Sequence, residues 1–287
     1  MIRFETLTKP GRTLSPKRAK ALRDEILALN LGLSAAEAFQ ANWRARIDSF
    51  LDTTDVVDCV WDGDRLVGHL GERHFELMGY QAVYIDSLTV LPTLQKSGIG
   101  RKLTGRSVLR TNLKWRGRDV LHVSRTSNPH VAAGTWAGVP LAQDYYPNFD
   151  PEQTSPADLP AIAAELCEML WPEVPFHPET GVLEGAYGGH FIPVRPTRHE
   201  LVANFFEQHI DAERGDAIVN IIRYHPMLWM RLAVYFASHI AKKKARTRRS
   251  SPPVERDLDI AADAGYALSK DPMNHIEESR HATQDRS

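Results

Sequence analysis

The chain has 287 residues, of which 43% are hydrophobic and 25% are charged, and its formal net charge is -1. This composition is typical of a globular protein and excludes a largely disordered one. A nearly neutral chain has no global field that attracts nucleic acid, so no nucleic-acid partner is expected. The two cysteines, Cys59 and Cys167, provide no disulfide framework, which fits a reducing compartment.

Neither a signal peptide nor a membrane span is predicted. Residues 1–10 contain no apolar stretch of signal-peptide length, so a cytoplasmic location is expected. The most apolar region, residues 221–240, is interrupted by Arg223, His225, Pro226 and Arg231. A membrane-spanning helix needs about 20 nearly uninterrupted apolar residues. No transmembrane segment is therefore expected.

The first half of the chain predicts an alternation of strands and helices. Residues 1–7 favour a short strand, and Ser15 followed by Pro16 is a typical helix start. A second helix is predicted from Ser34, with Glu37 completing a capping box. Three meandering strands and then a helix, a strand and a further helix follow, over residues 56–61, 66–75, 82–90, 99–111 and 120–124 and from about residue 128.

The second half predicts a different organisation. We expect a core domain over residues 1–141, a mainly helical extension over residues 142–249 and a polar, flexible tail over residues 250–287. Helical patterns cover residues 157–170, 200–210 and 217–240, and residues 182–183 and 190–194 are candidates for short strands. The extension is expected to be a cap over the site of the core domain or a dimer face, and a homodimer is one alternative. The six cations within residues 242–249 favour a solvated helix end over lipid or nucleic-acid contact.

The most informative segment is a glycine-containing loop between a predicted strand and a predicted helix. It reads Val90-Leu91-Pro92-Thr93-Leu94-Gln95-Lys96-Ser97-Gly98-Ile99-Gly100-Arg101. A helix N-terminus presents unpaired N–H groups and the positive end of the helix dipole. Glycines let a phosphate approach this backbone closely, and five basic residues surround the helix start: Lys96, Arg101, Lys102, Arg106 and Arg110. The segment therefore predicts a polyphosphate site.

Two common nucleotide-binding loops fit less well. The Walker A pattern is absent, because no Gly-Lys-Ser/Thr follows four spacer residues. The dinucleotide-binding fingerprint needs a third glycine where Leu103 stands, and it belongs to the first βαβ unit of its fold.

The loop resembles the signature of the GNAT (GCN5-related N-acetyltransferase) superfamily. In that family a strand ending V-x-P is followed by Q/R-x-x-G-x-G/A, and here Val90, Pro92, Gln95, Gly98 and Gly100 occupy those positions. The resemblance covers about residues 1–140, because the order of predicted elements also agrees. It implies an α/β class and an acyl-CoA N-acyltransferase fold, in which helices flank a mixed central sheet.

The resemblance also implies which residues hold coenzyme A. Backbone amides of the loop would bind the pyrophosphate, and backbone groups of the preceding strand would contact the thioester. A gap between that strand and the next, at residues 120–124, would admit the pantetheine arm. The implied cofactor-binding residues are Leu88, Thr89, Val90, Gln95, Lys96, Ser97, Gly98, Ile99, Gly100, Arg101 and Asn128.

Acyl transfer to an amine requires a proton acceptor and a proton donor for the leaving thiolate. Asp86 is the first candidate base, because relatives often carry an acidic residue at this position, and pairing with an arginine is its structural alternative. Glu72 is second, and His122 is third but better explained as a packed strand residue. The family's usual acid is a tyrosine within residues 131–139, which this chain lacks, so Tyr145 and Tyr146 are the candidate donors.

A metal is not expected. His69, Glu72 and His74 are close in sequence, but in a strand only Glu72 and His74 share a face. The sequence therefore predicts a metal-independent transferase that uses acetyl-CoA or another acyl-CoA as cosubstrate and a small-molecule amine as acceptor. The alternative is a module that binds acyl-CoA without turning it over.

Overall fold

The computed structural model describes residues 1–137, 142–189, 196–224, 226–228 and 230. Contacts group residues Met1–Tyr235 into one compact unit. Residues 236–287, which include the basic run at 242–249 and the polar tail, lie outside the described residues, as does the predicted strand at 190–194. Among the described residues, no helix combines the length and apolar composition that crossing a bilayer requires.

The first elements follow the sequence pattern closely. Strand β1 (Ile2–Thr8) is followed by the short helix α1 (Pro10–Thr13) and by α2 (Pro16–Leu31), whose N-cap Ser15 accepts a hydrogen bond from the N–H of Arg18. Helix α3 (Glu37–Thr53) starts later than expected, with Ala36 as its N-cap. The predicted capping box is wrong, because Ser34 Oγ instead accepts from Ala36 N, 3.1 Å away, in the turn before the helix.

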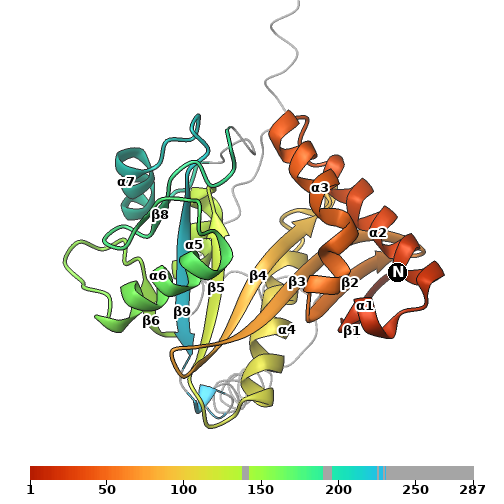
Figure 1. The fold of residues 1–287 in the computed structure, drawn as a ribbon, viewed down its shortest axis with the longest axis horizontal. Helices are drawn as coiled ribbons and strands as arrows, with labels where there is room; N and C mark the ends of the chain where they lie inside the picture. The colour runs from red at the N-terminus through yellow and green to blue at the C-terminus, as the bar shows by residue number, and fades with distance from the viewer. Residues whose placement is uncertain (138–141, 190–195, 225, 229, 231–287) are drawn as a thin grey trace, which may run out of the picture. The chain divides into compact units, whose positions relative to one another are not determined.

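The meander and the elements after it complete the first half. They are β2 (Val56–Asp62), β3 (Arg65–Leu77), β4 (Tyr80–Val90), the 3-10 turn η1 (Pro92–Leu94), α4 (Ile99–Lys114), β5 (Val120–Thr126) and α5 (Pro129–Ala137). β1 to β4 pair antiparallel in chain order, whereas β4 and β5 pair parallel. The α/β class and the mixed central sheet are therefore confirmed (Figure 1).

The second half contributes strands to the same sheet. It contains β6 (Ala142–Tyr146), α6 (Asp158–Leu170), β7 (Phe176–His177), β8 (Val182–Leu183), α7 (Glu200–His209) and β9 (Ala217–Tyr224). The sheet order is β1-β2-β3-β4-β5-β9-β8-β7, and β6 also pairs with β9. The short strand predicted at residues 182–183 is confirmed as β8, whereas β6 and β9 are strands that the sequence pattern did not predict.

The helix predicted over residues 217–240 is wrong for its first eight residues. All eight residues of β9 are buried, because β5 pairs with the strand, β6 and β8 pair with different parts of it, and helices cover both faces. A strand that is buried on both faces shows a continuous apolar run, which cannot be distinguished from a buried helix by periodicity. Residues 225, 229 and 231–240 lie outside the described residues.

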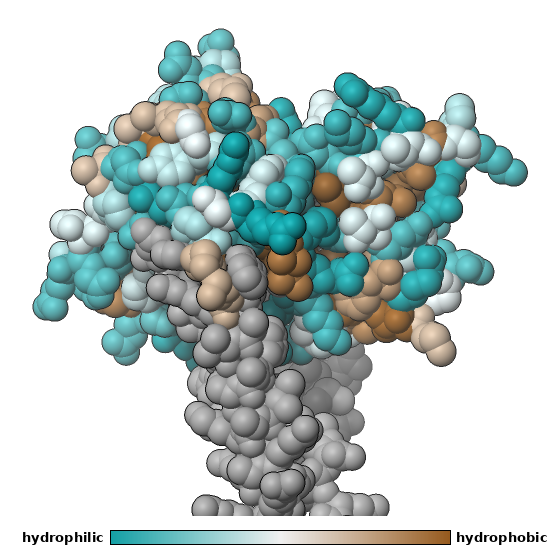
Figure 2. Space-filling view, turned by 90° about the horizontal axis from the view of Figure 1, so that it is seen from below, coloured by the Kyte–Doolittle hydropathy of each residue, from teal (hydrophilic) through white to brown (hydrophobic). Residues whose placement is uncertain are grey.

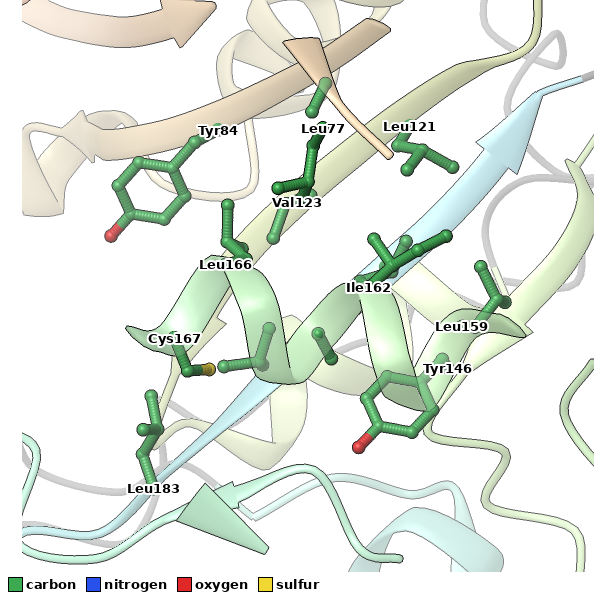
Figure 3. Close-up of a cluster of buried hydrophobic side chains, with 14 residues drawn as sticks. Leu77, Tyr84, Leu121, Val123, Tyr146, Leu159, Ile162, Leu166, Cys167 and Leu183 are labelled. Atoms are coloured by element: carbon green, nitrogen blue, oxygen red, sulfur yellow. The ribbon is translucent and has the colours of Figure 1, made fainter. Parts of the chain in front are cut away.

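Helices cover the two faces of the sheet unequally. α2 and α3 pack over β2 and β3, and α6 packs over β4, β5 and β9 on the same face (Figure 1). The α6 side chains Leu159, Ile162 and Leu166 point toward Leu121 and Val123 of β5 in Figure 3. On the opposite face α4 covers β2 and β3, and α5 and α7 cover the start of β9. The surface seen in Figure 2 is mainly hydrophilic, with small separate hydrophobic patches.

Candidate acyl-CoA site

The parallel strands β4 and β5 separate in the middle of the sheet. Their pairing runs from Gln81 opposite Val120 to Ile85 opposite Ser124 and then stops, although β4 continues to Val90. In the register with β3, Glu72 faces Ile85 and Gly71 faces Ser87, so Asp86 is an extra residue in a β-bulge. A bulge bends its strand, which accounts for the separation. The predicted gap therefore begins after residues 120–124, which are themselves paired on both sides.

The separation leaves backbone groups of β4 without a strand partner. Leu91 N–H donates to Val67 O of β3, 2.8 Å away. Because the backbone polar groups of a strand alternate in direction, those of Thr89 also point toward β3, and those of Leu88 and Val90 point toward β5. No described strand pairs with β4 on that side beyond Ile85. Of the three predicted thioester contacts, Leu88 and Val90 thus present their backbone to the gap, and Thr89 does not.

Thr89 has a structural role. It is buried, and its hydroxyl donates to Asn30 Oδ1 of α2 at 2.7 Å. This bond connects the end of β4 to helix α2.

The glycine loop connects β4 to α4 and has an open surface at the helix start. Gly98 is the N-cap of α4 with φ 81°, a backbone conformation that favours glycine, and Lys96 also has a positive φ of 71°. The first intrahelical bond is from Lys102 N to Gly98 O. The N–H groups of Ile99, Gly100 and Arg101 precede it and have no partner within the helix.

Among the described residues, almost nothing occupies the space where a side chain would begin at the two motif glycines. A Cβ added at Gly98 would meet nothing within 4 Å, and one at Gly100 would only touch Val90 Cγ2 at 4.0 Å. Internal packing therefore does not require glycine at residue 100. The loop is fixed by its own contacts: Gln95 Nε2 donates to Val90 O at 3.2 Å and Ser97 Oγ donates to Leu94 O at 2.6 Å.

Only three of the five predicted phosphate-binding cations remain beside the loop. Lys96, Arg101 and Lys102 are exposed. Arg106 donates to Thr6 Oγ1 and lies over the Phe4 ring, and Arg110 pairs with the buried carboxylates of Asp58 and Glu72. Helical spacing carries these two arginines one and two turns farther along α4, over β1 and β2.

Glu72 lies on the α4 face of the sheet in a closed ion network. Its side chain is fully buried, accepts a hydrogen bond from Arg110 and lies 3.0 Å from His74 Nε2. Burial raises its pKa, but the hydrogen bond with His74 and the charge of Arg110 outweigh burial and lower the pKa below its ordinary value. This candidate base is therefore held as a carboxylate by structural partners.

Asp86 lies on the opposite face, at the start of the gap. Its carboxylate accepts a hydrogen bond from Arg46 of α3, and the Arg46 guanidinium lies over Trp43 and Phe50. The arginine pairing that competed with a catalytic role is thus present. The pair is partly exposed, with 27% of the Arg46 side chain and 12% of the Asp86 side chain accessible.

Ser87, next to Asp86, forms a second polar pair that the sequence analysis did not single out. Its Oγ lies 3.1 Å from His69 Nε2, and His69 is enclosed by the rings of Trp43 and Phe50. Burial, with a smaller contribution from the charge of Arg46, lowers the pKa of His69 to about 3, so its imidazole is neutral. The bulge places Asp86 and Ser87 on the same face of β4, which strand alternation alone would not predict.

The tyrosine candidates for the general acid have their hydroxyl groups engaged. Tyr145 donates to Thr135 O at 3.1 Å, and Tyr146 donates to Pro178 O at 2.6 Å. Burial raises the pKa of both phenols above the ordinary value. Both residues lie in β6 and are separated from β4 by β9 and β5. Their position and bonds therefore indicate packing roles.

The remaining candidates are also located by the structure. Asn128 Oδ1 accepts from His130 N at 2.9 Å at the start of α5, just past the end of β5. His122 is buried with its Nε2 2.9 Å from Thr111 Oγ1, as expected of a packed strand histidine. His69 lies on the α3 face, whereas Glu72 and His74 lie on the α4 face. The described residues contain no group of three His, Cys, Asp or Glu side chains arranged to hold a metal.

Asn220 of β9 is a polar residue near the gap that the sequence analysis missed. It faces Ser124 of β5 in the sheet register, is only 5% exposed, and its Nδ2 has no hydrogen-bond partner among the described residues. The apolar run of residues 217–224 predicts a helix, so the sequence pattern does not place Asn220 in the sheet beside the gap.

Comparisons with known proteins give structural neighbours only. No family model matches the chain, and no curated protein matches it. A GNAT family acetyltransferase from Streptococcus pneumoniae is 21% identical, with a TM-score of 0.26, over 38% of this chain and 66% of its own length. A Trypanosoma brucei acetyltransferase is 14% identical, with a TM-score of 0.33, over 47% and 90%.

A third solved structure is a GNAT family acetyltransferase from Brucella melitensis in complex with acetyl-CoA. It is 15% identical, with a TM-score of 0.30, over 42% of this chain and 75% of its own length. Scores this low transfer no activity to this chain. The sequence motif and the strand order of the N-terminal part resemble those of GNAT proteins.

Proposed function

We propose that this protein is a GNAT-type acyltransferase that moves an acetyl or other acyl group from coenzyme A to an amine of a small molecule. The observation that carries the proposal is the combination at the end of β4. The backbone groups of Leu88 and the N–H of Val90, which have no strand partner among the described residues, adjoin an unobstructed glycine N-cap at Gly98. A thioester in the gap and a pyrophosphate at the start of α4 fit these two features.

The residues of the chain suit such a ligand. The N–H groups of Ile99, Gly100 and Arg101 would donate to phosphate oxygens, with Lys96 and Lys102 adding charge. Leu88 or Val90 N–H would donate to the thioester carbonyl as it gains negative charge. Asn220 and Asn128 border the path between these points and offer side-chain amides to the pantetheine arm.

The acceptor would approach from the face occupied by α3 and α6. Asp86 lies on this face where β4 leaves β5, and it remains the best-placed carboxylate to take the amine proton. Glu72 is less suitable because it lies on the α4 face in its own ion network. The two predicted donors, Tyr145 and Tyr146, lie away from the gap with their hydroxyl groups bonded to backbone carbonyls, so we infer that water protonates the leaving thiolate.

The described part of residues 142–249 would form one wall of the acceptor site. α6 and the residue after it, Trp171, pack on the sheet next to β4, with Trp171 and Tyr84 at 5.5 Å between ring centroids. This supports a role as a cap over the acceptor in preference to a dimer face.

Two measurements on the full chain test the proposal. Calorimetry with coenzyme A tests binding, and thiol release from acetyl-CoA with a panel of primary amines tests transfer. Binding together with amine-dependent thiol release is expected. Binding without release for any amine would instead support the second candidate, a module that holds acyl-CoA without turnover, which the arginine pairing of Asp86 favours. Absence of binding would contradict both.

A further inference from the structure

Arg125 lies at the point where β5 loses β4 as its neighbour. Ser124 is the last β5 residue opposite β4, and Arg125 follows it. Leu121 and Val123 pack against α6, so alternation places the Arg125 side chain on the same face. Tyr84 and Asp86 of β4 share that face, as their contacts with Trp171 and Arg46 show. Arg125 therefore faces the acceptor side of the gap, across from Asp86.

Two aromatic rings fix the direction of its guanidinium. The guanidinium carbon lies 4.5 Å from the ring centroid of Trp171 and 4.6 Å from that of Tyr187. Its Nη1 donates to Ala186 O at 3.4 Å. A planar cation held against two rings loses little further freedom when it binds a ligand through its edge.

The charge of Arg125 is not neutralised by the protein around it. Among the described residues no carboxylate oxygen lies within 4 Å of it, and its buried Nε has no hydrogen-bond partner. Other inward-pointing arginines differ: Arg110 pairs with Asp58 and Glu72, and Arg223 pairs with Asp144 and Asp158. The guanidinium has five donors, of which one bonds to Ala186 O and another interacts with the Tyr187 side chain, so donors remain for an anion.

The net charge beside the gap is positive because Arg125 has no carboxylate partner among the described residues. The charge of Asp86 acts on Arg125, but Asp86 is already paired with Arg46. Although burial lowers the pKa of Arg125, nearby Tyr187, Tyr84 and Asp86 outweigh it and raise the pKa, so the side chain stays charged. Two guanidinium groups and one carboxylate leave one uncompensated positive charge.

We propose that Arg125, held between Trp171 and Tyr187, binds an anionic group of the acceptor, a carboxylate or a phosphate, and so restricts the substrates to anionic amines. This rests on the proposed function, because it names the acceptor class of that same site. The guanidinium fork matches both groups bidentately, and an amine attached to the bound anion would extend toward Asp86 and the gap.

The test compares matched acceptors that differ in one charge. Thiol release from acetyl-CoA is measured with glycine against glycinamide and with phosphoethanolamine against ethanolamine, and then with longer pairs of each type. The wild type is expected to have a higher kcat/KM for the anionic member of at least one series, which also separates carboxylate from phosphate. Arg125→Gln should lower that value roughly tenfold to a hundredfold, the loss expected of a charge-assisted hydrogen bond, through KM.

Controls separate recognition from folding. Arg116→Gln changes the same charge at an exposed site near the other end of β5, and it should leave the preference intact. Arg125→Lys keeps the positive charge but loses the two-pronged guanidinium geometry. This variant should fold even if Arg125→Gln does not, and it should lower kcat/KM only for the anionic acceptors. Equal loss for charged and neutral acceptors with a lowered Tm, or no preference in the wild type, would overturn the proposal.

A readout without turnover distinguishes failure of this proposal from failure of the proposed function. Ligand-observed NMR measures binding of N-acetylglycine and N-acetylglycinamide to the full chain. If thiol release fails for every amine, binding of the charged probe that Arg125→Gln abolishes and Arg116→Gln retains still supports the anion site. If neither probe binds, or both bind equally, the anion site is refuted.

Discussion

The carboxylate of Asp86 accepts a hydrogen bond from Arg46 and so joins the bulge of β4 to helix α3. Arg46 is held in turn by the rings of Trp43 and Phe50, 4.6 and 5.3 Å from its guanidinium carbon. The pair lies where β4 and β5 separate, with Ser87 and His69 adjacent. Asp86 is therefore the carboxylate that the proposed amine acceptor would meet on this face of the sheet.

Replacing Asp86 by Asn tests its role as a base. Asn keeps the size and polarity but does not accept the amine proton, so kcat should fall about a hundredfold or more, within the range for general-base catalysis. The affinity for coenzyme A should hold, because Asp86 lies away from the loop. Steady-state kinetics and calorimetry provide the two values, with Asp24→Asn on the exposed face of α2 as control. Unchanged turnover with an unchanged pH profile would show that Asp86 has a structural role. The polar pair of Ser87 and His69 would then be the next candidate for accepting the amine proton.

Gly100 offers a direct test of the pyrophosphate site. Since a Cβ at residue 100 meets only Val90 Cγ2 at 4.0 Å, Gly100→Ala should keep or slightly raise stability within the first turn of α4. Gly100→Val should weaken coenzyme A binding roughly tenfold or more, because its methyl groups occupy the phosphate position. Calorimetry and Tm are measured together, with Gly105→Ala farther along the same helix as control, where a Cβ is also unobstructed.

Gly98→Val should weaken coenzyme A binding too, but with an additional effect on the fold. Its φ of 81° disfavours a side chain by about 1–2 kcal/mol. Wild-type affinity in both valine variants would contradict the assignment of the loop.

Arg101 tests the charge contribution beside the same loop. Arg101→Ala removes one exposed cation, so coenzyme A affinity should fall by roughly tenfold to a hundredfold at low ionic strength. The loss should shrink as salt screens the charge. Arg106→Ala should have a smaller effect, because Arg106 is bonded to Thr6 and lies over Phe4. A loss at Arg101 that is independent of salt would indicate packing instead.

Buried His122 should make the fold sensitive to acid. Burial lowers its pKa from 6.5 to about 4, so the unfolded chain binds the proton more readily. Stability therefore rises with pH between about 4 and 6.5, and acidification from pH 7 to pH 5 should remove about 2 kcal/mol through this residue. Urea unfolding at the two pH values measures it. His122→Gln should reduce the pH dependence, whereas His130→Gln, at an exposed histidine, should not. Equal pH dependence in all three proteins would refute this account.

Truncation after residue 141 should prevent formation of a soluble, folded core. The cut removes β9, which pairs with β5 from Val120 to Thr126, and α6, which covers the apolar side chains of β4 and β5. An unpaired β5 edge beside an uncovered apolar face favours aggregation. Solubility and size-exclusion chromatography of the fragment test this expectation. A monodisperse fragment that binds coenzyme A would show that residues 1–141 form an independent domain.

The local features of this protein can be predicted from short stretches of its sequence. Ser15 with Pro16 set the start of α2, alternation and turn residues set the β2–β3 hairpin, and Gly98 and Gly100 set the loop and the start of α4. Each depends on residues close together in the chain, where backbone propensity and capping decide the structure. The α/β class and the location of the loop followed from these local signals.

Tertiary structure decided which partner each polar side chain found. Arg110 is predicted as a phosphate ligand but pairs with Asp58 and Glu72. Asp86 pairs with Arg46 of α3. Tyr145 and Tyr146 donate to backbone carbonyls. Residues 217–224 became a strand because β5 offered an edge to pair with, although the apolar run is compatible with a helix. Arg125 was indistinguishable from any strand arginine in the sequence. Its role depends on the rings of Trp171 and Tyr187, which lie 46 and 62 residues farther along the chain. It also depends on the lack of a carboxylate partner among the described residues.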